Sequence, residues 1–385
     1  MMNKKTNPHL NTPSGKTRAR GLGVQFEGVA GTNNAITDVP GVDVGYVTLI
    51  SGDGKMTMGE GPVRTGVTAI LPRGRDGVGI SCAAGVHSFN GNGEMTGYSW
   101  IEEAGSLMMP VLISNTHAIG PLHRGTVDWV VKNKPDVASQ WLLPVCAETW
   151  DGYLNDINGP HVTTAHAVEA INKAASGAIE EGSVGGGTGM NCYAFKGGSG
   201  SASRVVSYGQ CDYTVGVFLQ ANFGSRHELT IGGVPVGRDL PNPMEDFFSG
   251  RAAGAGSCIG IVATDAPLLP GQCKALARRV PLGLARTGTA GSHFSGDIFL
   301  AFSTANPDAL NGRFPDGPPD ETSYCHMDFL PWGRMDDFYT AVVQATEEAV
   351  LNALIANEDM IGRDGNVSPA LQHDLVRAVA ARQNA

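Results

Sequence analysis

The most constraining feature of this 385-residue sequence is a set of short segments that are almost continuously apolar. Residues 110–114, 214–220 and 258–263 are rich in apolar residues and carry no charge. Such runs are typical of buried β-strands, and strands without a polar face need cover on both sides. Helical patterns are few, the clearest at 163–175, and they do not alternate regularly with the strands. We therefore predict an α/β fold with two stacked sheets flanked by helices, rather than a doubly wound sheet.

Several local predictions refine this architecture. Residues 34–46 alternate apolar and polar side chains around a Pro-Gly pair, which predicts a strand, a turn and a second strand. Residues 64–72 and 77–84 are predicted to form a further strand pair, and residues 270–284 a single helix. Residues 1–22 are polar and basic with two prolines, so we expect a frayed arm.

Charge and cysteine content narrow the class of partner. A net charge of −10 without a basic tract disfavours nucleic acid and anionic membrane surfaces. The seven cysteines contain no CxxC pair and mostly lie in apolar runs, so we predict reduced thiols and a cytoplasmic protein. The polar start of the chain predicts no signal peptide, and no apolar stretch reaches the roughly 18 residues of a membrane span.

One of the apolar segments begins at a serine that follows a glycine. Residues 225–256 are rich in Gly, Pro and charge and form the best candidate linker, after which Ser257 opens the strand at 258–263. A cut between Gly256 and Ser257 would free an α-amine beside the hydroxyl. Such an amine has a reference pKa of about 7.7–8.0 and can serve as a base near neutral pH. On local sequence alone, the junction is more often an ordinary turn-to-strand boundary.

Other catalytic chemistries find less support. The ten histidines are dispersed and show neither HExxH nor a zinc-binding spacing, so no metal is expected. The polar glycine loop at 90–97 matches no nucleotide-binding pattern, and no cofactor is expected. Neither Ser257 nor Ser295 lies in the GxSxG motif of α/β-hydrolases. An unrelated Ser-His-Asp triad stays open, because triads are defined by geometry and not by spacing.

Several motifs in one order converge on a known family. The sequence Gly-Ser-Cys-Ile-Gly-Ile-Val-Ala-Thr-Asp-Ala-Pro-Leu at 256–268 resembles the self-processing site of the DmpA-type L-aminopeptidase/D-Ala-esterase/amidase enzymes and their β-aminopeptidase relatives. Further motifs of this family match at 34–42, 66–70, 215–224 and 295–304. The resemblance covers almost the whole chain, apart from the N-terminal arm and the loop at 225–250.

This resemblance implies a four-layer αββα sandwich in which residues 1–385 form one self-processing hydrolase domain. Cleavage between Gly256 and Ser257 would give an α part, 1–256, and a β part, 257–385. The implied activity is that of a serine aminopeptidase, which releases small N-terminal residues (L- or D-alanine, or β-amino acids) from peptides, amides and esters. The resemblance also implies a homotetramer that needs no cofactor.

The resemblance assigns roles to five residues. Ser257 would be the nucleophile that forms an acyl-enzyme. Asn222 matches the asparagine that donates to the oxyanion, and Tyr153 the tyrosine near the same intermediate. Ser295 and Asp297 match the family's Ser-Gly-acid motif, although relatives can carry Glu at the second position. The general base stays open between this pair and the α-amine of Ser257.

Substrate recognition and alternative functions are less defined. A free substrate amine needs an acidic partner, for which Glu148 and Asp151 are candidates, and Glu94 a weaker one. An acyltransferase of the ornithine acetyltransferase type resembles this architecture but uses threonine at the cut, so Ser257 argues against it. A non-enzymatic scaffold is the third possibility. No motif indicates the preference for L-, D- or β-residues.

Overall fold

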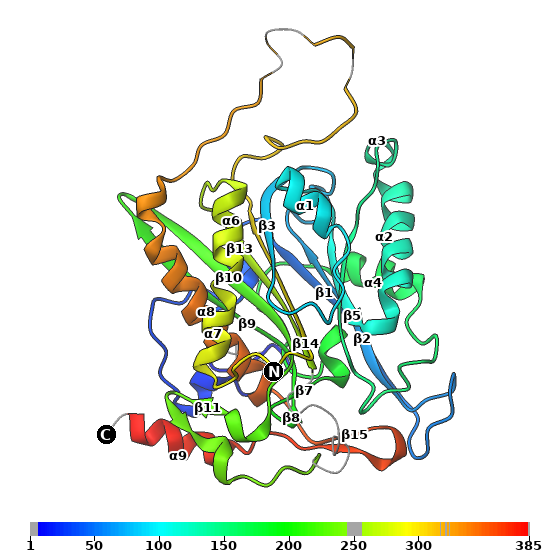
Figure 1. Cartoon of the computed structure of the whole chain (residues 1–385), viewed down its shortest axis with the longest axis vertical. Helices are drawn as coiled ribbons and strands as arrows, with labels where there is room; N and C mark the ends of the chain where they lie inside the picture. Colours follow the sequence, from blue (N-terminus) through cyan, green and yellow to red (C-terminus); the bar gives the residue numbers. More distant parts are fainter. Residues whose placement is uncertain (1–6, 245–255, 316, 320–321, 323, 384–385) are drawn as a thin grey trace, which may run out of the picture.

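The computed structural model describes residues 7–244, 256–315, 317–319, 322 and 324–383. Two β-sheets lie face to face in the middle of the molecule, and helices cover the outer face of each sheet (Figure 1). This is the predicted four-layer αββα arrangement. Residues 305–315 and 324–330 belong to a stretch that projects away from the body before α8 (Asp336–Ile355) begins (Figure 1).

The first sheet has four strands in the order β1-β2-β5-β6. Its strands β5 and β6 are parallel, and the other neighbours are antiparallel. Helices α2 (Ile119–Asn133) and α4 (Thr164–Lys173) pack together on its outer face. The strands are β1 (Asp43–Ser51), β2 (Val63–Leu71), β5 (Val111–Asn115) and β6 (Val145–Thr149).

The second sheet has six strands in the order β4-β3-β14-β13-β10-β9. Only β13 and β14 are parallel to each other. Helices α6 (Pro270–Ala277), α7 (Val280–Arg286) and α8 cover its outer face. The strands are β4 (Ser106–Leu107), β3 (Cys82–Ser88), β14 (Ser295–Ser303), β13 (Gly256–Thr264), β10 (Cys211–Asn222) and β9 (Gly198–Tyr208).

An apolar layer joins the inner faces of the two sheets. Val44 and Ile113 of the first sheet pack there with Phe218, Ile259 and Phe302 of the second. Two further clusters fill the spaces between each sheet and its helices. Residues 257–264 of β13 are therefore all buried, as strands covered on both faces require.

The prediction of a strand at 34–39 is wrong, because residues Ile36–Asp38 form a 3₁₀ turn, η2. The Asp38 carboxylate accepts hydrogen bonds from the backbone N–H groups of Asn33 and Ala35, at 2.8 and 3.2 Å. An aspartate that bonds backbone in this way stabilises a turn in competition with a strand. The second predicted strand of this region is β1.

The predicted pairing of 64–72 with 77–84 is also wrong. The strands exist as β2 and β3, but they belong to different sheets, and β3 begins only at Cys82. Turns occupy residues 72–79, where Gly77 donates its N–H to the Arg73 carbonyl. The single helix predicted at 270–284 is divided into α6 and α7, with Pro281 in the first turn of α7. Proline fits a helix start but not a helix interior.

The expected frayed arm is anchored in the part that the structure describes. The buried Arg18 guanidinium pairs with Glu181, and Arg20 pairs with Glu348 of α8. Arg204 of β9 also pairs with the Glu348 carboxylate, at 2.8 Å from Oε2. The pairs of Arg18 and Arg20 thus hold the start of the chain against the middle of the chain and against α8.

The predicted linker at 225–256 contains local structure where it is described. Residues 226–239 form the 3₁₀ turns η5 (Arg226–Glu228) and η6 (Val236–Asp239), with a short hairpin of β11 (Thr230–Ile231) and β12 (Val234–Pro235) between them. Residues 245–255 of the predicted linker lie outside the described residues.

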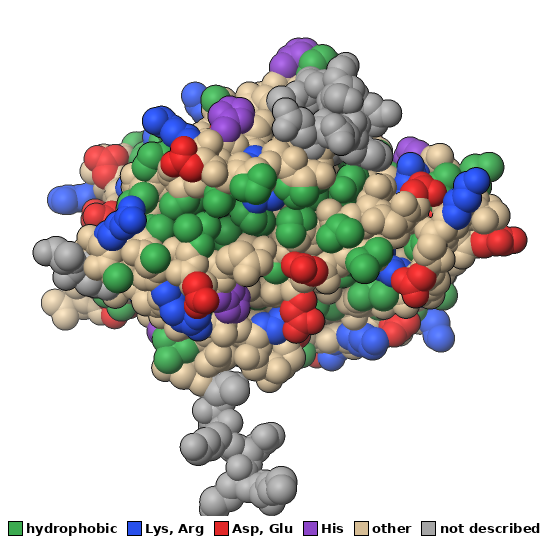
Figure 2. Space-filling model, turned by 90° about the horizontal axis from the view of Figure 1, so that it is seen from below, with side chains coloured by type: hydrophobic (Ala, Val, Ile, Leu, Met, Phe, Trp, Pro, Cys, Tyr) green, Lys and Arg blue, Asp and Glu red, His purple; other side chains and the backbone are tan. Residues whose placement is uncertain are grey.

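The lower face of the molecule carries an apolar band surrounded by charges of both signs (Figure 2). Basic side chains on this face are interspersed with acidic ones and form no broad positive field. Within the described residues, no helix combines the length and the apolar character that crossing a membrane requires.

Candidate active site

Ser257 lies at the start of β13 in the middle of the six-stranded sheet. The strand begins at Gly256, so the structure describes the uncut chain, in which the Ser257 nitrogen is an amide. The Ser257 side chain is buried, and its Oγ accepts a hydrogen bond from the Trp150 backbone N–H at 3.2 Å. The predicted nucleophile therefore has a fixed donor on one side, and the Gly256–Ser257 peptide bond, the predicted cleavage site, beside it.

Asn222, the last residue of β10, lies directly opposite Ser257 in the antiparallel ladder. Its Oδ1 accepts a hydrogen bond from the Asn191 backbone N–H at 2.8 Å, and its Nδ2 donates to the Trp150 carbonyl at 2.9 Å. A carbonyl oxygen can only accept and an amide NH₂ can only donate, so these two contacts fix the amide orientation. Among the described residues, no acceptor takes the second N–H of Nδ2.

Strand alternation places the Ser257 and Asn222 side chains on the inner face of the sheet. In β13, Ile259 packs between the two sheets, whereas Cys258 packs toward the helices. Ser257 shares the face of Ile259, because side chains two residues apart point the same way. By the same argument Asn222 shares the inner face with Phe218 of β10. The candidate nucleophile and oxyanion donor therefore face the same layer.

Ser295 and Asp297 lie on the other face of the same sheet. In β14, Phe299 packs toward the helices and Ile298 between the sheets, so Ser295 and Asp297 share the outer face of Phe299. Ser295 is paired with Gly256 in the parallel ladder, and Asp297 with Cys258. This pair therefore flanks the backbone around Ser257 from the face opposite to its hydroxyl.

The Ser295–Asp297 pair is a buried hydrogen-bonded unit. Ser295 Oγ donates to Asp297 Oδ1 at 2.7 Å, and Asn90 Nδ2 donates to Asp297 Oδ2 at 3.1 Å. Burial raises the pKa of Asp297 from 3.8 to about 6, although both hydrogen bonds lower it. Asn90, in the polar glycine loop, was not among the predicted site residues. Its only sequence signal was the polar character of that loop.

Tyr153 lies in the loop after β6 and is almost fully buried. Its hydroxyl donates to the Val367 carbonyl at 3.2 Å, and its ring packs with Leu154 and Met244. Burial raises its pKa. Tyr153 is three residues from Trp150, whose backbone contacts both Ser257 and Asn222, so the loop joins all three predicted residues.

The two candidate acids for substrate binding have different surroundings. Glu148, at the end of β6, accepts hydrogen bonds from the Glu94 backbone N–H at 3.0 Å and from the Thr116 hydroxyl. Asp151 is fully buried and accepts a hydrogen bond from Asn155 at 3.0 Å. Burial raises the pKa of Glu148, and it raises the pKa of Asp151 to about 7. Glu94, the weaker candidate, therefore contacts Glu148 through its backbone N–H.

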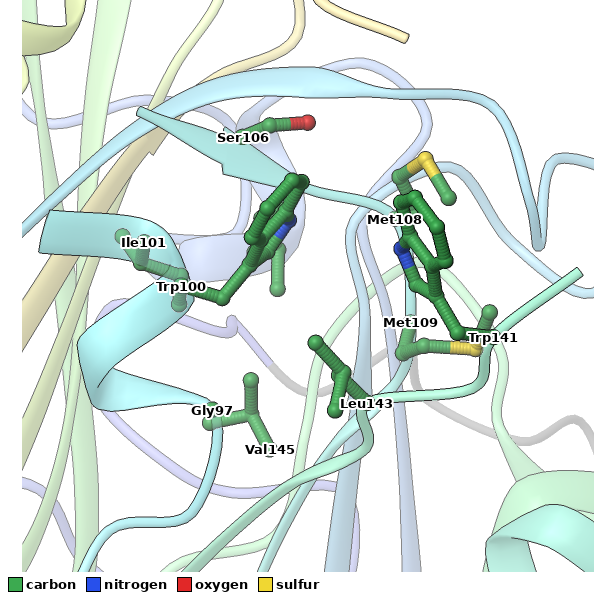
Figure 3. Close-up of a pocket in the computed structure, with 10 residues that line it drawn as sticks. Gly97, Trp100, Ile101, Ser106, Met108, Met109, Trp141, Leu143 and Val145 are labelled. Atoms are coloured by element: carbon green, nitrogen blue, oxygen red, sulfur yellow. The ribbon is translucent and has the colours of Figure 1, made fainter. Parts of the chain in front are cut away.

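A small pocket elsewhere in the fold shares none of the predicted site residues. It measures about 20 Å³ and is lined mainly by indole, thioether and aliphatic side chains, among them Trp100, Trp141, Met108 and Leu143 (Figure 3). A space of this size holds a water molecule but no substrate. Within the described part of the chain, no three His, Cys, Asp or Glu side chains are grouped so as to hold a metal ion.

The buried Asp297 carboxyl is expected to make stability depend on pH. Its folded pKa lies above the unfolded value, so its protonated form favours the folded state below about pH 4, and this contribution disappears as pH rises through about 6. A tenfold change in proton affinity is worth about 1.4 kcal/mol, so the loss amounts to roughly 3 kcal/mol. Asp297→Asn cannot ionise and should abolish this loss.

Denaturant unfolding at pH 4 and pH 7 tests this expectation in a Ser257→Ala background, where the chain stays in one piece. Asp212→Asn is the matched control, because the Asp212 carboxylate also accepts a serine hydroxyl, that of Ser207, but at an exposed turn. An Asp297→Asn protein with the same change in unfolding free energy between the two pH values as its parent would contradict the expectation.

The fold and the site together define a hydrolase of the N-terminal-nucleophile type, with a serine that opens a central strand of an αββα sandwich. A family model described as Peptidase family S58 matches residues 34–368, and the chain belongs to this family of serine aminopeptidases. The family resemblance inferred from the motifs is thereby confirmed.

Similar proteins support the same class. The chain is 48% identical over 372 residues to the β-peptidyl aminopeptidase BapA of Sphingosinicella microcystinivorans, which covers 94% of this chain and 91% of the relative. The solved L-aminopeptidase D-Ala-esterase/amidase of Ochrobactrum anthropi is similar with a TM-score of 0.85 at 45% identity, over 95% of this chain and 99% of that one. A β-aminopeptidase from Burkholderia sp. gives a TM-score of 0.84 at 40% identity, with the same coverage of both chains. These relatives favour the aminopeptidase over the acyltransferase alternative.

Proposed function

We propose that this chain cuts itself between Gly256 and Ser257 and then works as an aminopeptidase on small N-terminal residues. The observation that carries the proposal is the position of Ser257 at the head of β13, with its Oγ held by Trp150 and with Asn222 directly opposite. The products are the α part, 1–256, and the β part, 257–385, in one domain.

In the cutting step, Ser257 Oγ attacks the Gly256 carbonyl carbon and gives up its proton. The peptide C–N bond then breaks, the Ser257 nitrogen takes up a proton, and an ester joins Gly256 to Oγ. Water hydrolyses this ester to the Gly256 carboxylate and the free hydroxyl. Ser257 now carries an α-amine, as N-terminal nucleophiles require.

In the aminopeptidase reaction, the same Oγ attacks the substrate carbonyl and forms an acyl-enzyme that water releases. We assign the spare Nδ2–H of Asn222 to the oxyanion, with Tyr153 beside the same intermediate. The Ser257 α-amine accepts the Oγ proton. Ser295 and Asp297 orient this amine, because they flank the backbone of β13 from the face away from Oγ.

We assign the substrate amine to Glu148. Both Glu148 oxygens already accept hydrogen bonds within the chain, but Glu148 keeps 3% of its surface exposed. Asp151 is the alternative, because one of its oxygens has no partner among the described residues, but it has no exposed surface at all. Glu148→Gln removes the negative charge, so we expect the KM for L-alanine p-nitroanilide to rise by at least tenfold, the loss of a charge-assisted hydrogen bond. Asp151→Asn serves as the matched acid-to-amide change. A raised KM in Asp151→Asn alone would transfer the assignment to Asp151.

We infer the range of substrates from the names of the relatives, and a panel of substrates tests it. L-alanyl, D-alanyl and β-alanyl p-nitroanilides report amine release, and acetyl transfer to ornithine reports the acyltransferase alternative. We expect hydrolysis of at least one alanyl substrate and no acetyl transfer. Correctly cut protein that is inactive on all three substrates and does not react with serine-directed acylating reagents would contradict the proposed function.

We further propose a cytoplasmic homotetramer. All seven cysteines are unpaired, and five of them are buried, which suits a reducing compartment. Cell fractionation and light scattering of the purified protein test the two parts of this proposal separately.

A further inference from the structure

Lys196 is a fully buried lysine without an ion pair among the described residues. Its Nζ donates to the backbone carbonyls of Met190 and Gly197, at 2.7 and 2.9 Å. Burial lowers its pKa to about 7, and the nearby Asp151 acts in the opposite direction. Removing a lysine amine from water is costly, so its position at two carbonyls calls for an explanation.

The backbone around Lys196 is held in place from the C-terminal part of the chain. Its N–H donates to the Pro369 carbonyl at 2.7 Å, and its carbonyl accepts from Asn357 Nδ2 at 3.0 Å. Residue 196 is also paired with Asn191 in the short hairpin of β7 (Asn191–Cys192) and β8 (Phe195–Lys196). The amino group is therefore aimed at Met190 by a well-anchored backbone.

Met190 links this lysine to the candidate oxyanion donor. The carbonyl that accepts from Lys196 Nζ and the N–H of Asn191 belong to one peptide group. That N–H donates to Asn222 Oδ1 at 2.8 Å. A continuous chain of hydrogen bonds thus runs from Lys196 through one peptide group to Asn222, which lies opposite Ser257 in the ladder.

Hydrogen bonds in such a chain strengthen one another, because each donor polarises the next group. The Met190 carbonyl also accepts from the Gly197 N–H at 2.9 Å, so Lys196 Nζ is its second donor. This second donor makes the Asn191 N–H a better donor, and that contact in turn makes Asn222 Nδ2 a better donor. The polarisation points toward the place where negative charge develops on the substrate carbonyl. Such fixed donors aimed at developing charge stabilise transition states.

We propose that Lys196 is a positioning residue, which orients and polarises the Asn222 amide through the Met190–Asn191 peptide group. The inference rests on the proposed role of Asn222 as oxyanion donor. Lys196 itself touches neither substrate nor Ser257 in this arrangement. Its effect should therefore appear in kcat, should leave KM unchanged, and should disappear when Asn222 is absent.

The test is a double-mutant cycle with L-alanine p-nitroanilide, in which kcat is referred to the amount of cut chain. Lys196→Met keeps the unbranched apolar stem of the side chain but removes its donors. We expect a kcat about tenfold lower, a fraction of the 10²–10³ that losing an oxyanion donor costs, with KM within about twofold. In an Asn222→Ala background, the same change should lower kcat by less than twofold, because coupled residues are not additive.

Two further variants separate this role from a structural one. Lys196→Arg retains donors and should recover most of the lost kcat. Lys134→Met is the matched control, because Lys134 also donates to a backbone carbonyl, that of Asp76, but at an exposed site. If Lys196→Met does not fold, Lys196→Leu, which also lacks a donor, takes its place in the cycle.

The outcomes distinguish the proposed role of Asn222 from the proposed role of Lys196. A normal kcat in Asn222→Ala would overturn both the proposed role of Asn222 and the inference built on it. A loss in Asn222→Ala with no loss in Lys196→Met would overturn the inference alone. Additive losses in the double variant, or a raised KM at unchanged kcat in Lys196→Met, would also overturn it.

Discussion

Replacement of Ser257 by alanine is expected to leave the protein as a single 40.1 kDa chain on denaturing electrophoresis. The unaltered chain should separate into parts of 256 and 129 residues, and sequencing of the smaller part should begin Ser-Cys-Ile. Because the same hydroxyl serves both reactions, aminopeptidase activity should also fall, on the order of 10⁶-fold as for other serine nucleophiles.

Ser207→Ala is a suitable control for this experiment. Ser207 also lies in a strand of the six-stranded sheet, but its hydroxyl bonds to Asp212 at an exposed turn. This variant should be cut and active like the parent. A Ser257→Ala chain that still separates at the same bond would show that another group performs the cut.

Replacement of Asn222 by alanine is expected to lower kcat by about 10²–10³-fold with little change in KM. The reason is that the spare Nδ2–H can reach an oxyanion but forms no described contact with the ground-state chain. Steady-state kinetics on L-alanine p-nitroanilide measure both constants. Self-cleavage should slow as well, since it passes through a similar tetrahedral intermediate.

Asn133→Ala is the matched control for Asn222→Ala. Asn133 Nδ2 also donates to a tryptophan carbonyl, that of Trp129, within α2 and away from the site. Its loss should leave kcat unchanged. If Asn222→Ala instead raised KM at constant kcat, Asn222 would contribute to substrate binding and not to the transition state.

The layers of the fold could be predicted from sequence because burial leaves a direct mark on composition. Strands such as β13 are covered on both faces, and the residues between its polar ends, Cys258 to Ala263, are therefore all apolar. The pairing of strands within a sheet does not change composition in this way. β2 and β3 are neighbours in sequence and both apolar, yet they belong to opposite sheets, which is decided by packing between distant segments.

In the candidate site, too, some residues could be predicted from the sequence and others could not. Ser257, Asn222 and the Ser295–Asp297 pair were found through motifs that resemble a family, and the structure places them around one strand end. Trp150 was missed because it acts through its backbone, which any residue type supplies. Lys196 was missed because a lysine at the end of a two-residue strand gives no sign in the sequence that it will be buried.

The strand order of the central sheet has a consequence for how the cut enzyme regains its structure. β13 and β14 of the β part lie between β3 and β10 of the α part, and Arg20 and Arg204 of the α part both bind Glu348 of the β part. Neither part can complete the sheet alone. The uncut chain folds as a first-order process, whereas the separated parts must first meet in solution. The proposed cut would therefore make refolding second-order, so that dilution alone would slow the recovery of the denatured enzyme.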